Sequence, residues 1–415
     1  MTTLKGACLI GQSGGPTSVI NSSVLGCVEA ALKSEYITKV FGAAHGIKGI
    51  LNDYLYDLTL EDPEELKLLK HTPSAALGSC RYKLADPDID DTDYKRFLEI
   101  LKKYGIRYFF YIGGNDSMDT CNKLGRFLSD NDYECRVIGI PKTIDNDLAI
   151  TDHCPGYGSA AKYVATTFME VYRDATVYDS GSITVIEVMG RNAGWLTAAS
   201  ALAKYNGAGP DLIYLPEVAF DLEKFVTDVE RVYKEKGYVI VAVSEGVKDK
   251  EGKYISSYFT DMANKKDAFG HAQMGGLAAG LANYANKKIH AKIRGIELSL
   301  LQRCAAHLAS KTDIEEAYMA GKAALEAAVD GQTAKMVAFK REEGEEYICK
   351  TILVDLSEVA NVEKTIPREW INKEGNDVLK AFIDYALPLV QGETEMKYEN
   401  GLPRFARLKK IKAKA

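Results

Sequence analysis

The sequence predicts an α/β fold made of two doubly wound lobes with mostly parallel sheets, and three observations indicate it. Short β-rich runs alternate along the chain with segments whose apolar residues recur three and four positions apart. The β-rich runs are apolar throughout, which is typical of parallel strands covered on both faces. The chain of 415 residues is long enough to form two lobes.

The individual elements follow from the same patterns. Helical periodicity is clearest over residues 91–105, 159–175 and 311–329, and the last of these opens with the capping box Thr312-x-x-Glu315. The basic tail at 407–415 is expected to be a solvated, frayed terminus. Strands are expected to begin at Ala7, Tyr108, Arg136, Ser182, Leu212, Tyr238 and Ile293.

Composition excludes several classes of protein. The formal net charge of −6 argues against non-specific nucleic-acid binding, so an anionic ligand would need a locally basic pocket. The eight cysteines form no CxxC pair, which argues against a disulfide framework or a zinc cluster. No apolar run is long enough for a signal peptide or a membrane span, so we expect a cytoplasmic protein.

Polar residues gather where the expected strands end. Ligands of open α/β sheets bind beyond the carboxyl ends of the strands, so these positions predict one binding region. Two glycine turns, at Gly14–Gly15 and Gly113–Gly114, precede helices and suit an anion, although a tight turn alone would look the same. The other polar strand ends are Asn115–Ser117, Lys142–Asp147, Gly190–Asn192 and Glu245.

For each of these groups, a purely structural role is the alternative to ligand binding. Asn115 and Asp116 favour a metal–phosphate site over simple helix caps, because one cap needs only one such residue. Arg191 suits an anion better than a structural ion pair, whereas Glu245 suits sugar hydroxyls or a lysine about equally. The GxGxxA pattern at Gly156 does not follow a strand directly, so we interpret it as a helix start and not a dinucleotide site.

Together these groups favour phosphoryl transfer, which needs positioning, charge neutralisation and a base for the acceptor hydroxyl. Asp145 is the candidate base because a carboxylate is ionised at neutral pH, and an Asx turn is its structural alternative. Asp147 would hold magnesium or orient that base.

At this point the ensemble resembles the phosphofructokinase family. The stretches "SGG", "GSCRYK", "IGGNDS", "PKTIDND", "GYGSAAKYV", "VMGRNAG", "LPEV", "SEG" and "LQR" occur in that family's order and spacing over roughly residues 5 to 340. The resemblance implies two doubly wound lobes with the active site in the cleft between them. It also implies Mg²⁺-dependent phosphorylation of the 1-hydroxyl of fructose 6-phosphate.

Position by position, the resemblance implies the following roles. The catalytic residues would be Asp145 as proton acceptor, Asp147, Lys142 and Arg191. The phosphoryl donor would contact Gly15, Arg81, Gly114 and Lys142, and the metal would be held by Asn115 or Asp116. The sugar phosphate would contact Thr143, Ile144, Met189, Gly190, Glu245, Arg294 and Arg303. Arg294 resembles an arginine that reaches a neighbouring subunit, so a homodimer or homotetramer is expected.

Asp116 and Lys142 together predict the donor, and Asp116 is the deciding residue. The ATP-dependent pattern has glycine at both positions, where the nucleotide passes, but some ATP-dependent relatives also carry the lysine. A carboxylate about 4 Å from a phosphate, at an effective dielectric constant of about 20, costs roughly 4 kcal/mol. Pyrophosphate ends before that point, and Lys142, expected to pair with Asp116, would neutralise it. The sequence therefore resembles the pyrophosphate-dependent branch, which interconverts fructose 6-phosphate and fructose 1,6-bisphosphate reversibly.

The alternatives are an ATP-dependent 6-phosphofructokinase and a non-catalytic regulatory subunit that binds sugar phosphates. Leu300 and Ser182 depart from the family pattern and affect the details of the sugar-phosphate site. We expect the donor lobe to comprise residues 1–156 and about 304–362, and the fructose 6-phosphate lobe residues 157–303 and about 363–415. No nucleic-acid or membrane partner is expected.

Overall fold

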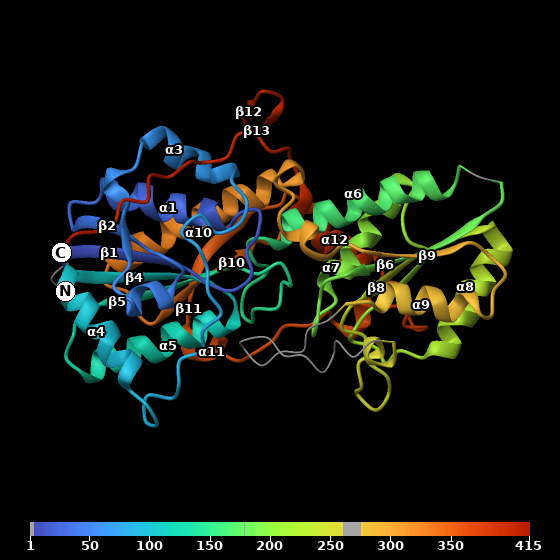
Figure 1. The fold of residues 1–415 in the computed structure, drawn as a ribbon, viewed down its shortest axis with the longest axis horizontal. Coiled ribbons are helices and arrows are strands. Elements are labelled where there is room, and N and C mark those ends of the chain that lie inside the picture. The colour runs from blue at the N-terminus through green and yellow to red at the C-terminus, as the bar shows by residue number, and fades with distance from the viewer. Residues whose placement is uncertain (1–3, 178, 260–274) are drawn as a thin grey trace. The chain divides into compact units, whose positions relative to one another are not determined.

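The computed structural model describes residues 4–177, 179–259 and 275–415 (Figure 1). Their contacts divide the chain into two compact units. Unit 1 comprises Met1–Ser159, Arg303–Glu363 and Gly392–Ala415, and unit 2 comprises Ala160–Gln302 and Lys364–Gln391. No described helix is both long and apolar enough to cross a membrane.

Unit 1 is built on a seven-stranded sheet in the order β11-β10-β5-β4-β1-β2-β3. Its inner strands run parallel, while the two edge strands, β3 and β11, run antiparallel to their neighbours. The strands are β1 (Gly6–Gln12), β2 (Ile37–Ala43), β3 (Leu55–Asp57), β4 (Ile106–Gly113), β5 (Arg136–Pro141), β10 (Lys335–Arg341) and β11 (Cys349–Asp355).

Helices cover both faces of this sheet (Figure 1). One face packs against α1 (Ile20–Lys33) and α10 (Lys311–Val329), and the other against α4 (Thr92–Tyr104), α5 (Asn115–Asp130) and α11 (Leu356–Val359). Successive residues of β4 alternate between the two cores: Tyr108 and Phe110 face α1 and α10, while Phe109 and Tyr111 face α4 and α5. Burial of both faces explains why the residues of this strand are apolar almost throughout.

Unit 2 contains a four-stranded, wholly parallel sheet in the order β7-β8-β6-β9. The strands are β6 (Ser182–Val188), β7 (Leu212–Tyr214), β8 (Tyr238–Ser244) and β9 (Ile293–Glu297). One face packs against α8 (Leu222–Lys236) and α9 (Leu277–Asn286). The unit also contains α7 (Trp195–Ala199), α12 (Lys380–Ala386) and most of α6 (Tyr157–Ala175). The predicted α/β class, with two mostly parallel sheets, is confirmed.

The remaining elements are short. They are α2 (Ile47–Leu51), α3 (Pro63–Leu68), and the hairpin of β12 (Tyr398–Glu399) and β13 (Leu402–Pro403). Strands β2, β3, β10 and β11 were not anticipated from the sequence, and the partly exposed β2 and β11 lack the uniformly apolar pattern of a buried strand.

Two local predictions are wrong. The cap of α10 is Ser310, whose hydroxyl accepts from the Asp313 N–H, so the helix starts one residue before Thr312. The basic tail is docked on unit 1 and not frayed: Lys412 forms a β-bridge with Tyr56 of β3. Glu61 fastens the tail by accepting the backbone N–H groups of Lys409 and Lys410. The tail thereby covers the backbone of an edge strand.

Candidate active site

The two predicted carboxylates lie in the loop between β5 and α6, at the carboxyl edge of the sheet of unit 1. Asp145 and Asp147 flank Asn146, whose φ of 56° is in the left-handed region. Thr143 organises the turn: its hydroxyl oxygen accepts from the Asp145 N–H at 3.0 Å, and its side chain is hydrogen-bonded to Asp147. The backbone thus presents both acids from one tight turn.

Crowding perturbs the titration of this pair. Burial raises the pKa of Asp147 to about 7, and the negative charges of Asp145 and Glu363 act in the same direction. A shared low-dielectric site disfavours two adjacent carboxylate charges, so one acid keeps its proton to higher pH. The pair can therefore accept either a proton or a cation at neutral pH.

Cations face this pair from three segments of unit 1. The Lys142 ammonium donates to the Gly15 carbonyl at 2.7 Å and is only 4% exposed. Burial lowers the pKa of Lys142 to about 8, although Asp145 and Asp147 act to raise it. Arg303 and Arg81 also act to lower this pKa, which shows that their positive charges are nearby.

The Gly14–Gly15 turn approaches the same cations closely. Gly14 has a φ of 73°, and a Cβ at Gly15 would lie 2.9 Å from Nη1 of Arg303. Arg303, which the sequence predicted to grip the sugar phosphate, belongs by its contacts to unit 1 and lies with the predicted donor residues. A glycine turn ringed by Arg81, Lys142 and Arg303 is a site for a small polyanion.

The predicted ion pair between Lys142 and Asp116 is not formed in the described structure, because the lysine is directed to the Gly15 carbonyl. Asp116 lies half-buried in the first turn of α5, after Gly114, which is the N-cap residue of that helix. The positive end of the helix favours a carboxylate there without a lysine partner.

Asn115 is engaged elsewhere. Its Oδ1 accepts from the Asn361 N–H at 2.5 Å, and its Nδ2 donates to the Val362 carbonyl at 2.9 Å. These bonds fasten the segment that carries Glu363, and Glu363 forms a β-bridge with Leu148 beside the carboxylate pair. Sequence reasoning missed Glu363, because no motif links it to residues some 200 positions earlier.

In unit 2, three predicted sugar-phosphate residues and the predicted catalytic Arg191 come together at the ends of β6 and β8. Gly190 has a φ of 139°, and its N–H donates to Oε1 of Glu245 at 3.4 Å. The Met189 N–H donates to Oε1 of Gln302 at 3.3 Å. Arg191 follows directly and is partly exposed. A guanidinium and a carboxylate on adjacent turns suit a ligand that carries both a phosphate and hydroxyl groups.

Arg294 lies apart from these residues within its own chain. It pairs with Thr184 in the sheet, near the start of β6, which is roughly 15 Å along the strand from the turn at Met189. Its side chain is exposed and lies 3.7 Å from the carboxylate of Asp174.

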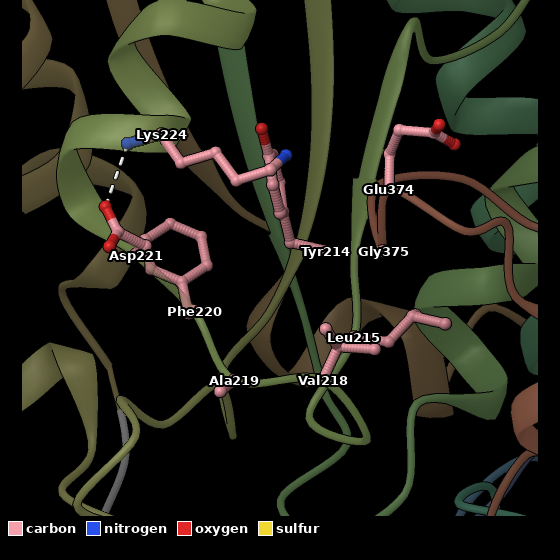
Figure 2. A pocket seen from close by; sticks show the side chains of 9 residues that line it. All are labelled: Tyr214, Leu215, Val218, Ala219, Phe220, Asp221, Lys224, Glu374 and Gly375. Atoms are coloured by element: carbon pink, nitrogen blue, oxygen red, sulfur yellow. Dashed lines mark hydrogen bonds between the residues drawn. The ribbon is translucent and has the colours of Figure 1, made fainter.

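Two further features do not form a ligand site. The Gly156 pattern opens α6, and the Asp313 carboxylate accepts the N–H groups of Gly156 and Ser159 at 2.9 and 2.8 Å. The chain's own acid therefore occupies the place of a nucleotide phosphate. A shallow pocket of unit 2 lies beside Asp221, the residue that caps α8 by accepting the Lys224 N–H (Figure 2). None of the predicted site residues lines it.

Known proteins of one family are similar to this chain in sequence and in structure. The family model described as "Phosphofructokinase" matches residues 7–295, well over half of the chain. The chain belongs to the phosphofructokinase family. Phosphofructokinase relatives match it over nearly its whole length. A protein from Halomonas elongata named "Pyrophosphate--fructose 6-phosphate 1-phosphotransferase" is 43% identical over 403 residues, which is 96% of this chain and 95% of the relative.

Another relative and a solved structure agree. A protein of the same name from Xanthomonas campestris pv. campestris is 40% identical and covers 98% of this chain and 97% of its own. The crystal structure titled "Pyrophosphate-dependent phosphofructokinase from Marinobacter aquaeolei" matches with a TM-score of 0.89 and 38% identity, over 99% of this chain and 98% of that one.

Proposed function

We propose that the chain is a diphosphate–fructose-6-phosphate 1-phosphotransferase. It transfers a phosphoryl group from pyrophosphate to the 1-hydroxyl of fructose 6-phosphate, reversibly and with Mg²⁺. The observation that carries the proposal is the buried Lys142 at the glycine turn, which places a charge for a small polyanion next to a carboxylate pair. The full-length relatives named for this reaction support it.

The acceptor hydroxyl gives its proton to Asp145 as its oxygen forms the new bond to phosphorus, and the phosphate leaves from the other side. Thr143 and Asp147 hold that base in its turn, and the buried Ile144 supports the substrate from the same turn. Gly15, Gly114 and Arg81 receive the pyrophosphate, and Lys142 balances its charge. Arg303 contributes a further positive charge to the transferred group.

Oxygen ligands suited to Mg²⁺ are present in unit 1. Burial raises the pKa of Asp147, and the charges of Asp145 and Glu363 act in the same direction, so a bound cation would offset the cost of ionising this carboxyl group. We assign the metal to Asp147 and not to Asn115, because the oxygen and the nitrogen of the Asn115 amide are both already hydrogen-bonded to the backbone of residues 361 and 362. When bound, Mg²⁺ would supply charge neutralisation for the phosphates.

Asp116 selects the donor. Its carboxylate, estimated at about 4 Å from the extra phosphate of a nucleotide, would repel that phosphate by roughly 4 kcal/mol, which is about a thousandfold in affinity. Pyrophosphate lacks the nucleotide portion and avoids this repulsion. Asp116, which replaces the glycine of ATP-using members, is therefore the residue that determines donor specificity.

Met189, Gly190, Arg191 and Glu245 bind the sugar phosphate. The hydrogen bond from Gly190 to Glu245 supports this, since it ties the arginine turn to the acid that would accept sugar hydroxyls. Arg294 serves the site of a neighbouring copy, because it is exposed and distant from that turn in its own chain. A homodimer or homotetramer follows.

The test is a coupled assay of the purified protein with pyrophosphate and with ATP at equal concentrations. Turnover with pyrophosphate alone is expected, and turnover with ATP alone would overturn the proposal in favour of an ATP-dependent 6-phosphofructokinase. Asp116→Gly should raise kcat/KM for ATP, by up to about a thousandfold. Asp130→Gly, the same change at the exposed C-terminal end of the same helix, is the matched control and should leave donor choice unchanged.

A further inference from the structure

The loop that carries the two carboxylates is fastened to α10 by a buried histidine. His153 is 1% exposed, and both of its ring nitrogens face carboxylates: Nδ1 lies 2.8 Å from Oδ1 of Asp152, and Nε2 lies 2.6 Å from Oε2 of Glu316. The ring stacks on Phe339 of β10 at 5.0 Å with an interplanar angle of 8°. Because both nitrogens face acceptors, both donate, and the ring is an imidazolium.

The groups around this ring balance its charge. Nη2 of Arg341 lies 3.0 Å from Oδ1 of Asp152, and the Tyr347 hydroxyl donates to Oε1 of Glu316 at 2.6 Å. Two cations and two anions therefore share the cluster. Burial lowers the pKa of His153, but Glu316 and Asp152 outweigh it and raise the pKa to about 9.

A metal site is the alternative explanation of this cluster. His153, Glu316 and Cys349 offer ligand atoms within 4.8 Å of one another. However, the 2.6 Å between Nε2 and Oε2 is a hydrogen-bond distance, and two ligands about 2.0–2.1 Å from a tetrahedral zinc would lie roughly 3.3 Å apart. The geometry is that of an ion-paired imidazolium.

This clamp is linked to the carboxylates through two residues. The backbone N–H of Cys154, next to His153, donates to Oδ1 of Asn146 at 2.9 Å. Asn146 is fully buried and holds the left-handed φ between Asp145 and Asp147. The distance and direction of the Cys154 N–H therefore decide whether that conformation is supported.

We propose that His153 and Asn146 are positioning residues for the phosphotransfer: the imidazolium clamp fixes Cys154, and Cys154 holds Asn146 so that Asp145 and Asp147 face the reacting groups. This inference rests on the proposed role of Asp145 as the base. A small displacement of a catalytic group costs up to about 100-fold in rate. Loss of the clamp should therefore lower kcat and leave substrate binding nearly unchanged.

The experiment compares His153→Gln, Asn146→Gly and the double variant. Asn146→Gly keeps the left-handed backbone accessible and removes the side chain that carries the acceptor. Each single variant is expected to lose about 10- to 100-fold in kcat, with KM for both substrates within about threefold of wild type. Because both residues act through one link, the double variant should be no worse than the poorer single variant. Multiplying losses would overturn the proposal.

Two controls separate positioning from folding. His290→Gln changes an exposed histidine of unit 2 and should have no effect. In His153→Gln the buried Glu316 carboxylate loses a partner, so adding Glu316→Gln should restore thermal stability without restoring kcat. Recovery of kcat together with stability would show that His153 only supports folding.

Nuclear magnetic resonance tests the inference independently of turnover. Labelled His153 should keep both ring protons at pH 8, where an ordinary histidine is neutral. The backbone amide signals of Asp145 and Asp147 should shift in His153→Gln, where the substitution lies several positions away, but not in His290→Gln. A neutral ring at pH 8, unshifted Asp145 and Asp147 amides, or one tightly bound zinc per chain would each refute the proposal. If no donor gives turnover, the proposed function fails while these signals still decide the clamp.

Discussion

Replacing Lys142 by methionine should stabilise the ligand-free protein while removing pyrophosphate turnover. The ammonium is 4% exposed, and burial lowers its pKa from 10.5 to about 8. A shift of that size corresponds to about 3 kcal/mol of cost for holding the charge in the folded state. Methionine has a similar shape but forfeits the hydrogen bond to the Gly15 carbonyl, worth about 1 kcal/mol. The net gain at pH 7 is therefore about 2 kcal/mol.

The pH dependence of this gain has a definite sign. Below pH 8 the lysine is charged in both states, and the folded protein bears the whole cost. Between pH 8 and 10.5 the unfolded chain binds the proton that the folded state has released, so wild-type stability rises with pH. The advantage of Lys142→Met should accordingly be largest at pH 7, vanish at about pH 9.5 and reverse by pH 10.5, where only the lost hydrogen bond remains.

Hydrogen exchange is the suitable measurement, because both tryptophans, Trp195 and Trp370, belong to unit 2 and report on that unit. Exchange of the β5 amides, in unit 1, should slow about 30-fold in the variant at pH 7. Pyrophosphate with magnesium should then protect the wild type and not Lys142→Met. A variant less stable at pH 7, or an advantage that grows with pH, would refute the reasoning that burial dominates this site.

Three further outcomes follow from the structure. Burial raises the pKa of Glu187 to about 7, so Glu187→Gln should stabilise unit 2 by up to about 3 kcal/mol at pH 8 and by little at pH 5. Tryptophan fluorescence during unfolding measures this difference, and equal stabilisation at the two pH values would contradict it. Because the pKa of His153 is raised, its charge stabilises the folded state fully below pH 6.5, and this stabilisation is lost as the pH rises through 9. Urea denaturation should therefore show that His153→Gln lowers the free energy of unfolding by up to about 3 kcal/mol, and that this deficit shrinks over that range. A deficit that stays constant would count against the reasoning. Asn115→Asp cannot donate to the Val362 carbonyl, so amides 361–363 should exchange about fivefold faster with α5 unchanged, and unaltered exchange would show that this bond contributes nothing.

The strands at the centre of both sheets could be predicted because parallel burial leaves a direct trace in composition. Runs such as residues 106–113 and 238–244 are apolar on both faces and need no context. The strands at one side of the sheet of unit 1 could not be predicted, since two of the first three residues of β2 are exposed and polar and β3 has only three residues. The docking of the tail was hidden for another reason: its partners, Glu61 and Glu65, lie more than 300 positions earlier.

The candidate site was predictable where its residues follow strands in short motifs. Gly15, Lys142, Asp145, Met189 and Glu245 all lie where the motifs indicated. Contacts made across the sequence were not predictable. The commitment of Asn115 to residues 361 and 362, and the bridge that brings Glu363 to Leu148, depend on how the chain passes over α5.

The loop after β5 holds two groups of buried charges, and the direction of their pKa shifts distinguishes their purposes. At the clamp, the chain's own acids outweigh burial, and His153 is raised to about 9. At the turn of Asp145 and Asp147, burial dominates: it lowers the pKa of Lys142 to about 8 although both carboxylates act to raise it, and it raises the pKa of Asp147 to about 7.

A charge that its own chain already stabilises gains little from a ligand, so the clamp positions the loop without binding one. A base and an acid that both shift toward neutrality gain most from opposite charges brought by a ligand, as a cation and a polyanion would do together. Binding magnesium pyrophosphate should therefore raise the pKa of Lys142 and lower that of Asp147 while leaving His153 unchanged.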